Sequence, residues 1–253
     1  MGKIYSFLNR LFIMLKSLFI TLILLSNNVL ADKSDIIKGL SAYFTGITEQ
    51  DISAMPFNGM YEVTLRDPKL DVIYVSADGR YLSQGEVIDL RTRTNLTQSR
   101  LSNLAKEIMS TTTDAEKIIY KADDEKYVID VFTDVDCPYC RKLHKDVTEL
   151  NKLGVTMKYL AFPRSGVNTK SYYRSVAIWC AENPEQAMDR GMLQKGNPLV
   201  NCKNPIIDHL ILAKKLNVTG TPFIFLENGD HIPGYVKPKD LLTEMQRSLA
   251  KYQ

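Results

Sequence analysis

Long hydrophobic runs are scarce in this chain. The uncharged apolar run from Leu18 to Leu25 has eight residues, whereas a membrane-spanning helix needs about 20. Three basic residues precede the run, and Val29-Leu30-Ala31 follows it with small residues at its first and third places. This order predicts a secretory signal peptide over residues 1–31, with cleavage after Ala31. A spanning helix is the alternative, and a start at Met14 in place of Met1 would leave a shorter signal.

A basic surplus is absent from the predicted mature chain. The whole sequence has 32 Lys and Arg against 29 Asp and Glu. The predicted signal holds three of the basic residues and no acidic ones, so 29 charges of each sign remain. Nucleic-acid binding depends on a basic surface, and we therefore expect no nucleic-acid partner. The remaining 222 residues suffice for one large domain or two small ones.

The first part of the mature chain, residues 32–96, is predicted to be a small α+β domain. Apolar residues recur at helical spacing from Ser34 to Phe44, and strand-like runs follow at Met60–Arg66, Asp71–Ser76 and Glu86–Leu90. About 60 residues is marginal for a self-sufficient core, so we expect this domain to need a partner surface.

A narrow apolar stripe marks the next segment, residues 97–113. Leu101, Leu104, Ala105 and Ile108 lie at helical spacing in a polar setting. They predict a linker helix from about Thr97 to Met109. The alternative, in which this helix packs fully into a flanking domain, stays open.

From residue 114 to residue 253, strands and helices alternate, which is typical of an α/β domain. Residues 169–217 are mostly helical in character and form a predicted helical insertion. Asn228-Gly229 is a strong hairpin signal. The other predicted elements are strands at Tyr127–Thr133, Val155–Phe162, Pro222–Glu227 and His231–Tyr235, and helices at Pro138–Leu153 and Pro238–Ala250.

The candidate catalytic residues are Cys137 and Cys140 in the run Cys137-Pro138-Tyr139-Cys140. Cys137 ends a buried-type strand and begins a helix, with Pro138 at the first helical position. The positive end of the helix favours the thiolate, so we predict a lowered pKa and a nucleophilic sulfur at Cys137. Cys140 lies one turn further on the same face and can attack a mixed disulfide at Cys137.

Three other interpretations apply to these residues. A fixed structural disulfide between two such close cysteines would gain little from loop closure. A zinc site usually pairs two short-spaced ligand couples, and Cys180 and Cys202 are 22 residues apart. His144 follows Cys137 by seven residues on the same helical face, but a lone helical histidine is more often solvated. We therefore expect no metal and a solvated His144.

The other two cysteines, Cys180 and Cys202, have no helix-start context, and Cys180 follows the apolar Ile178-Trp179. We predict a structural disulfide between them that staples the helical insertion and stabilises it by about 3 kcal/mol.

Thr221 and Pro222 form the second predicted site element. The run Thr219-Gly220-Thr221-Pro222 leads directly into a strand, and a proline after glycine at a strand's start is compatible with a cis bond. If this loop faces the cysteine pair, its backbone can bind an extended substrate.

Several runs of this chain, taken together, resemble one family along nearly the whole mature length. They are Val131-Phe132-Thr133-Asp134, Lys142-Leu143-His144, Tyr159-Leu160-Ala161-Phe162-Pro163-Arg164, Ile178-Trp179-Cys180-Ala181, Gly220-Thr221-Pro222 and Pro233-Gly234-Tyr235. The family is that of the bacterial periplasmic disulfide isomerases DsbC and DsbG, in the thioredoxin superfamily.

The resemblance implies a periplasmic homodimer, V-shaped and joined through the N-terminal domains. It implies a thioredoxin-like catalytic domain on each linker helix, and no cofactor. Misfolded, wrongly bridged secreted proteins would be the substrates, and a membrane thiol reductant of the DsbD type would keep the cysteines reduced. The expected activity is disulfide isomerisation and reduction by the Cys137 and Cys140 pair.

Two departures from family patterns leave alternatives open. DsbC proteins often have glycine at the position of Pro138, whereas DsbG has proline there. The alternative function is therefore that of a DsbG-like chaperone and thiol reductase, or of a DsbA-like thiol oxidase. Thioredoxin has a buried acid where this chain has Val131. Asp130 is one position away and points to the other face of a strand, so we assign no buried general base.

Overall fold

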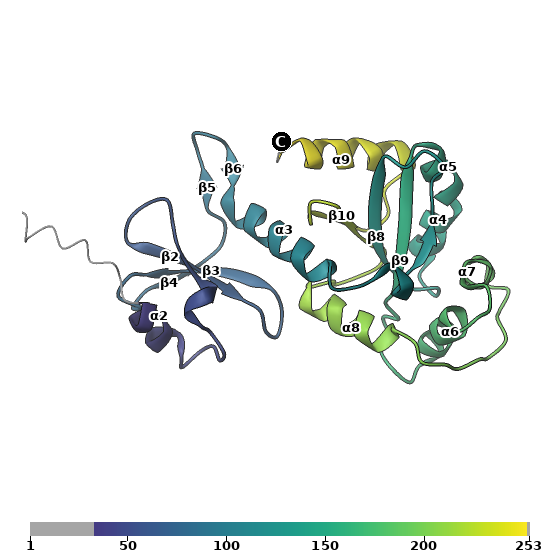
Figure 1. Cartoon of the computed structure of the whole chain (residues 1–253), viewed down its shortest axis with the longest axis horizontal. Helices are drawn as coiled ribbons and strands as arrows, with labels where there is room; N and C mark the ends of the chain where they lie inside the picture. The colour runs from purple at the N-terminus through teal and green to yellow at the C-terminus, as the bar shows by residue number, and fades with distance from the viewer. Residues whose placement is uncertain (1–32, 252–253) are drawn as a thin grey trace, which may run out of the picture. The chain divides into compact units, whose positions relative to one another are not determined.

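The computed structural model describes residues 33–251 (Figure 1). The predicted signal peptide, residues 1–31, lies outside this range. Among residues 33–251 two compact units form: one from residues 33–61 together with 75–82, and one from residues 62–74 together with 83–251. Within the described range, every helix is too short or too polar to cross a membrane.

The first part of the described chain is a helix followed by a four-stranded sheet. Its strands are hydrogen-bonded in the order β1-β2-β3-β4. Against the prediction of a helix to Phe44, the helix ends at Leu40, because the N–H groups of Tyr43 and Phe44 close a turn on the Leu40 carbonyl. The elements are α2 (Lys33–Leu40), β1 (Ile52–Ala54), β2 (Met60–Leu65), β3 (Asp71–Ser76) and β4 (Leu82–Gln84).

The predicted strand Glu86–Leu90 is wrong in length. Only β5 (Ile88–Asp89) forms there, paired with the two residues of β6 (Thr94–Asn95). The Asp89 carboxylate accepts a hydrogen bond of 2.8 Å from the Arg91 N–H, which turns the chain directly after the strand.

The predicted linker helix is α3 (Leu96–Met109), which begins where the Asn95 side chain accepts a hydrogen bond from the Gln98 N–H. Ser102 of this helix is buried and donates a hydrogen bond to Asp230 in the turn after β10. A Cβ at Gly229 would lie 1.8 Å from the Ser102 carbonyl oxygen, so only glycine permits this approach. Helix α3 is part of the second unit, and these contacts join it to the turn after β10.

The second unit contains a five-stranded mixed sheet in the order β11-β10-β8-β9-β7. Strands β8 and β9 are parallel, and the other pairs are antiparallel. The strands are β7 (Ile118–Tyr120), β8 (Tyr127–Thr133), β9 (Val155–Ala161), β10 (Phe223–Leu226) and β11 (His231–Pro233), and the helices are α4 (Pro138–Lys145), α5 (Val147–Lys152), α6 (Lys170–Trp179), α7 (Pro184–Met192), α8 (Ile206–Lys215) and α9 (Pro238–Ala250). This alternation confirms the predicted α/β class.

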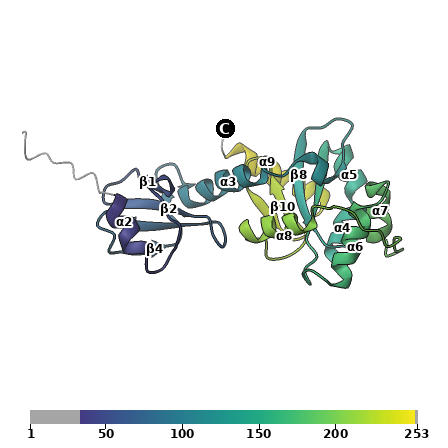
Figure 2. The ribbon, with the colours of Figure 1, turned by 60° about the horizontal axis from the view of Figure 1, so that its bottom comes forward.

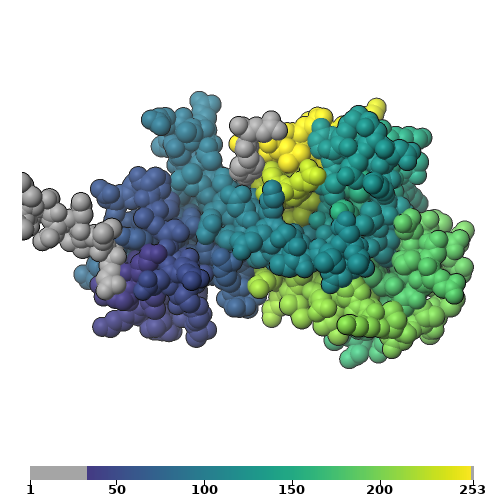
Figure 3. All heavy atoms as spheres, in the orientation of Figure 1, coloured from purple at the N-terminus to yellow at the C-terminus, as the bar shows by residue number. Residues whose placement is uncertain are grey.

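The helical insertion lies between β9 and β10. Helices α6 and α7 pack against each other and group with α4 (Figure 2). The segment between α7 and α8 runs along the surface of the unit (Figure 3), and Leu199 in it is 85% exposed. This segment contains no helix or strand, so its position depends on contacts with other parts of the unit.

The single helix predicted over Pro138–Leu153 is wrong, because the chain forms two helices that meet at Asp146. The Asp146 N–H bonds the carbonyls of Leu143 and His144, which tightens the last turn of α4. The Asp146 carboxylate accepts a 2.8 Å hydrogen bond from the Tyr235 hydroxyl. A hydrogen bond to a residue 89 positions further along the chain therefore stabilises the break between α4 and α5.

Candidate active site

The cysteine pair lies where β8 leads into α4. Cys137 is the residue before the first turn of α4, with extended backbone, and Pro138 occupies the first helical position. The Cys137 N–H closes a turn on the Asp134 carbonyl at 2.9 Å, and the Cys137 carbonyl accepts the Arg141 N–H at 3.1 Å. These bonds set the sulfur at the N-terminus of the helix, where free backbone N–H groups point toward it.

The loop before β10 completes the site. The Cys137 thiol donates a hydrogen bond of 3.2 Å to the Thr221 carbonyl, and the Thr221-Pro222 peptide bond is cis. This approach follows from the sheet, because Phe223 of β10 pairs with Phe132 of β8. The structure thus brings together two predicted site elements that are 84 residues apart in sequence.

The pKa values of the two cysteine thiols are shifted in opposite directions. A hydrogen bond from the Cys140 thiol, assisted by Thr221 and by the backbone N–H groups of Cys140 and Tyr139, outweighs burial and lowers the pKa of Cys137 to about 5. Burial, and next the hydrogen bond to Cys137, raises the pKa of Cys140. Cys137 is therefore suited to attack as a thiolate, while Cys140 holds its proton.

The cause of the lowered Cys137 pKa differs from the sequence argument, which assigned it to the helix alone. The Cys140 thiol contributes most, and the helix acts through the backbone N–H groups of Tyr139 and Cys140. The hydroxyls of Thr133 and Thr221 are also close enough to lower the pKa of Cys140, although neither makes a hydrogen bond of regular geometry.

Two aspartates near the cysteines form ion pairs with arginines that are distant in sequence. Asp134 is buried and accepts hydrogen bonds from Ser171 Oγ at 2.6 Å and from Arg164 Nε at 3.1 Å. Burial alone would raise the pKa of Asp134, but these hydrogen bonds and those from backbone N–H groups outweigh it, and the pKa is lowered. Asp136 pairs with Arg174 on α6. Each of these carboxylates is therefore paired with an arginine whose positive charge offsets its negative charge near the sulfur.

The basic residues adjacent in sequence do not fill this role. The Arg141 guanidinium donates to the Val135 carbonyl at 3.0 Å, and Lys142 Nζ lies 4.4 Å from the centre of the Tyr235 ring. Arg164 interacts electrostatically with both Cys137 and Cys140. Sequence reasoning missed the charge role of Arg164, since only the fold brings it to the site.

His144 is not solvated, contrary to the prediction. Its side chain is only 10% exposed, and it contacts Tyr159 of β9 and Asp189 of α7. Nδ1 is 3.3 Å from the Tyr159 hydroxyl, and Nε2 is 3.0 Å from Asp189 Oδ1. The helical position alone carried no sign of these contacts, because Tyr159 and Asp189 come from other elements.

Val131 is fully buried in the same cluster as the two cysteines. Its neighbour Asp130 forms an ion pair of 2.8 Å with Lys117. Side chains alternate along a strand, so the carboxylate lies on the face away from the cysteine pair. Asp130 is therefore directed away from the cysteine pair and toward Lys117.

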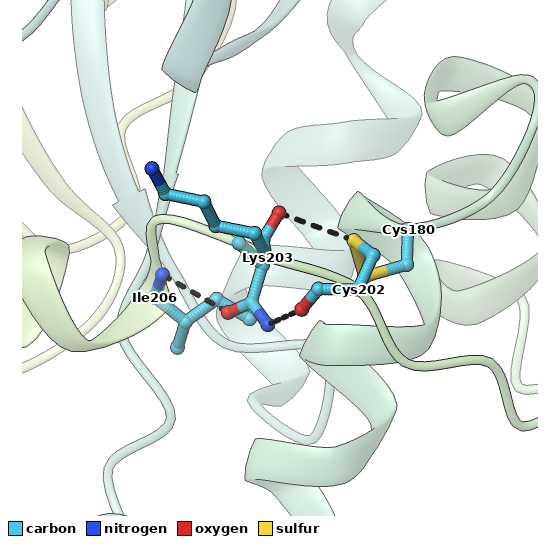
Figure 4. Close-up of a disulfide and its surroundings, with 5 residues drawn as sticks. Cys180, Cys202, Lys203 and Ile206 are labelled. Atoms are coloured by element: carbon cyan, nitrogen blue, oxygen red, sulfur yellow. Dashed lines mark hydrogen bonds between the residues drawn. A yellow bond between two sulfur atoms is a disulfide. The ribbon is translucent and has the colours of Figure 1, made fainter.

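Cys180 and Cys202 form a disulfide with a Cα–Cα distance of 5.7 Å (Figure 4). Cys180 directly follows the last residue of α6, and Cys202 belongs to the surface segment before α8. The bridge therefore anchors that segment to the helical insertion. The four cysteines lie in two separate pairs, and no group of three or more metal-ligating side chains occurs within residues 33–251.

Comparison with known proteins places this geometry in a family. A model described as a thioredoxin-like domain matches residues 113–248, and one described as a disulfide bond isomerase protein N-terminal domain matches residues 27–98. The thiol:disulfide interchange protein DsbC of Salmonella typhimurium is 39% identical over 202 residues, which are 78% of this chain and 80% of that protein. The chain belongs to the DsbC family.

Other relatives in the DsbC family are similar over comparable or greater lengths. DsbC of Escherichia coli is 38% identical over 78% of this chain and 80% of its own length, and DsbC of Pasteurella multocida is 34% identical over 91% and 99%. The solved structure of Proteus mirabilis ScsC in a transitional conformation has a TM-score of 0.50 and 23% identity, and covers 60% of this chain and 80% of that one. The resemblance inferred from sequence and the predicted fold class are both confirmed.

Proposed function

We propose that this protein is a periplasmic thiol-disulfide isomerase and reductase that rearranges non-native disulfides in secreted proteins. One observation carries the proposal. Cys137 is a low-pKa thiol at a helix N-terminus, its Sγ is 3.2 Å from the Thr221 carbonyl oxygen, and Cys140 is buried with a raised pKa. This arrangement supplies one nucleophile and one reserve thiol.

In the proposed mechanism, the Cys137 thiolate attacks one sulfur of a substrate disulfide. A bond forms between Cys137 and that sulfur, and the other substrate sulfur leaves as a thiolate. If this thiolate attacks elsewhere in the substrate, the final product is an isomer, and Cys137 is released unchanged. If it does not, Cys140 attacks Cys137, the substrate leaves reduced, and the pair is left oxidised.

The remaining proposed roles follow from the same site. Thr221 and Pro222 would bind the extended substrate backbone beside Cys137, and Cys180–Cys202 would be a permanent structural disulfide. The protein would be exported by its signal peptide, and a membrane thiol reductant of the DsbD type would reduce the oxidised pair. We propose a dimerisation domain at 32–96, a linker helix at 97–113 and a catalytic domain at 114–253.

The proposed homodimer would form through the N-terminal sheet. Strand β4 ends the sheet order, so one edge of it has no partner strand among residues 33–251. Its residues and the preceding Tyr81 are exposed. An edge of this kind can pair with the same edge of a second copy in an isologous contact.

The test is the recovery of activity by a scrambled, wrongly bridged substrate protein. Cys137→Ser should abolish isomerisation, whereas Cys140→Ser should retain part of it, because the substrate's own thiol can complete the exchange. Full isomerase activity in Cys137→Ser would overturn the proposal. Trapping the thiols in cells would separate an isomerase, whose pair is kept reduced, from an oxidase, whose pair is kept oxidised.

A further inference from the structure

A row of polar side chains runs outward from the buried cluster that contains Cys140. His144 follows Cys140 by four residues on α4, and positions four apart face the same side of a helix, about 6 Å apart. The hydroxyl of Tyr159, on β9, lies 3.3 Å from His144 Nδ1. Tyr159 and Cys140 are buried in the same cluster, and the charge of Cys140 acts on Tyr159. Tyr159 is paired with Val131 across β8 and β9, and Val131 is buried in that cluster as well. The Tyr159 ring therefore lies on the face of the sheet that packs against the cysteines.

The same row leads to the surface. The Tyr159 side chain is fully buried, His144 is 10% exposed, and Asp189 on α7 is 54% exposed. Asp189 Oδ1 lies 3.0 Å from His144 Nε2. Hydrogen bonds from Tyr159 through His144 to Asp189 thus connect the buried cluster that contains Cys140 with solvent, through β9, α4 and α7.

The hydrogen positions in this row follow from its acceptors. Asp189 can only accept when charged, so the imidazole hydrogen is on Nε2 and the lone pair of Nδ1 faces Tyr159. Burial lowers the pKa of His144, despite the opposing effect of Asp189, and keeps the imidazole neutral near pH 7. Burial also raises the pKa of Tyr159, which keeps its hydrogen and can relay a proton without becoming a persistent anion.

A further titratable group that faces His144 is Tyr120 on β7. Its ring meets the imidazole edge-on with centroids 5.3 Å apart, and its hydroxyl donates to Asp189 Oδ1 at 2.6 Å. Burial and the hydrogen bond to Asp189 raise the pKa of Tyr120, so it is neutral as well. Tyr120 orients the Asp189 carboxylate toward the imidazole and adds no charge.

Cys140 needs such a path, because it is 1% exposed and burial raises its pKa, yet it must lose its proton to resolve a mixed disulfide. The nearby Asp134 is occupied by Ser171 and Arg164 and has a lowered pKa, which makes it a weak base. We propose that Tyr159, His144 and Asp189 form a proton relay that takes the proton of the Cys140 thiol to solvent during the resolving step. The inference rests on the proposed function of Cys137 and Cys140.

The step balances without an added oxidant or reductant. The Cys140 proton passes to the Tyr159 oxygen while the Tyr159 hydrogen passes to His144 Nδ1. The Cys140 sulfur bonds to Cys137, the bond between Cys137 and the substrate sulfur breaks, and the substrate leaves as a thiolate that takes a proton from solvent. Asp189 stabilises the imidazolium, which then loses its proton to water. When the pair is reduced again, the relay runs in reverse.

The test measures the resolving step by itself. A mixed disulfide is made between Cys137 and an aromatic thiol, and the release of that thiol by Cys140 is followed by absorbance over a range of pH. Tyr159→Phe should slow release on the order of a hundredfold near neutral pH, the usual contribution of a positioned acid or base. Its rate should then rise in proportion to hydroxide. Tyr235→Phe, which removes a hydroxyl bonded to Asp146, is the matched control and should release the thiol at the wild-type rate.

The rate of Cys137 alkylation separates a proton relay from a purely structural role, because a distorted site would change that rate too. In Tyr159→Phe the alkylation rate should be unaffected, because the relay serves Cys140. His144→Gln is the second variant, which keeps a hydrogen-bonding side chain without a basic nitrogen. It should slow release by a similar factor and remove the inflection that the imidazole gives to the pH profile.

The outcomes separate the relay from the function on which it rests. Wild-type rates and pH profiles in both variants would overturn the relay alone. Equal slowing of release and of Cys137 alkylation would also overturn it, since the residues would then only shape the site. Failure of the wild-type protein to release the thiol would overturn the proposed function together with the relay.

Discussion

Removing the Cys140 thiol should raise the pKa of Cys137, because that thiol donates the hydrogen bond that lowers it most. A hydrogen bond to a charged group contributes about 1.5–3 kcal/mol, and one pKa unit corresponds to about 1.4 kcal/mol. Cys140→Ala should therefore raise the pKa of Cys137 from about 5 by about 1–2 units. The backbone N–H groups of Tyr139 and residue 140 remain, so it should stay below that of a free thiol.

Cys140→Ser is the matched variant, since its hydroxyl keeps a donor in the same place. The pKa of Cys137 should stay near the wild-type value in this variant. The assay is the pH dependence of thiolate ultraviolet absorption and of the alkylation rate, with the alkylated residue identified by mass mapping. Equal pKa values in the wild-type, alanine and serine proteins would refute the reasoning and assign the whole effect to the helix N-terminus.

The lowered pKa of Cys137 also makes the folding stability of the reduced protein depend on pH. The folded-state pKa of Cys137 is lowered, so the reduced protein gains stability that is fully present above the pKa of an unfolded thiol, about 8.5. That stability is lost as the pH falls toward about 5. In Cys140→Ala it should be lost at higher pH than in Cys140→Ser, as urea unfolding of the two reduced variants would show. Coincident profiles would contradict the lowered pKa.

Three further changes test other parts of the structure. Replacing Cys180 and Cys202 together with serine should lower the free energy of unfolding by about 3 kcal/mol and leave isomerase activity in the folded fraction; lost activity at unchanged stability in urea would make this pair catalytic. Gly85→Arg should give a monomer in sedimentation that keeps reductase activity and loses most isomerase activity, whereas Gly85→Ala, strained equally at its φ of 146°, should stay dimeric. A dimeric arginine variant would exclude this edge from the interface. Ser102→Ala removes a donor to the buried Asp230 and should cost about 1–3 kcal/mol, with faster hydrogen exchange in α3; unchanged exchange would show that α3 is held by other contacts.

Features with a local cause could be predicted from the sequence. The strand Tyr127–Thr133 and the helix Pro238–Ala250 have the predicted bounds, since hydrophobic periodicity and a proline at the first helical position are properties of consecutive residues. The hairpin at Asn228-Gly229 formed for the same kind of reason, because Gly229 adopts the positive φ that its turn requires. Position at a strand-to-helix junction also marked Cys137 as the candidate nucleophile.

Features that depend on residues far away in the sequence could not be predicted. The break at Asp146 has a partner in Tyr235, and no periodicity in the helical run announces it. The missed strand β7 has three residues and is defined by its pairing with β9. The strand expected at Glu86–Leu90 had suitable residues, but a turn closed by the Asp89 side chain ended it after two.

The sequence by itself determined which residues can carry thiol chemistry, which ones begin and end the main elements, and which family the chain resembles. Tertiary structure decided the surroundings of those residues: the thiol hydrogen bond to Thr221, the pairing of Asp134 with Arg164, and the burial of His144 against Tyr159. The physical reason is range. Helix and turn signals act within a few neighbouring positions, whereas a pKa or a proton path depends on groups that only the packing of the sheet and helices brings within hydrogen-bonding distance.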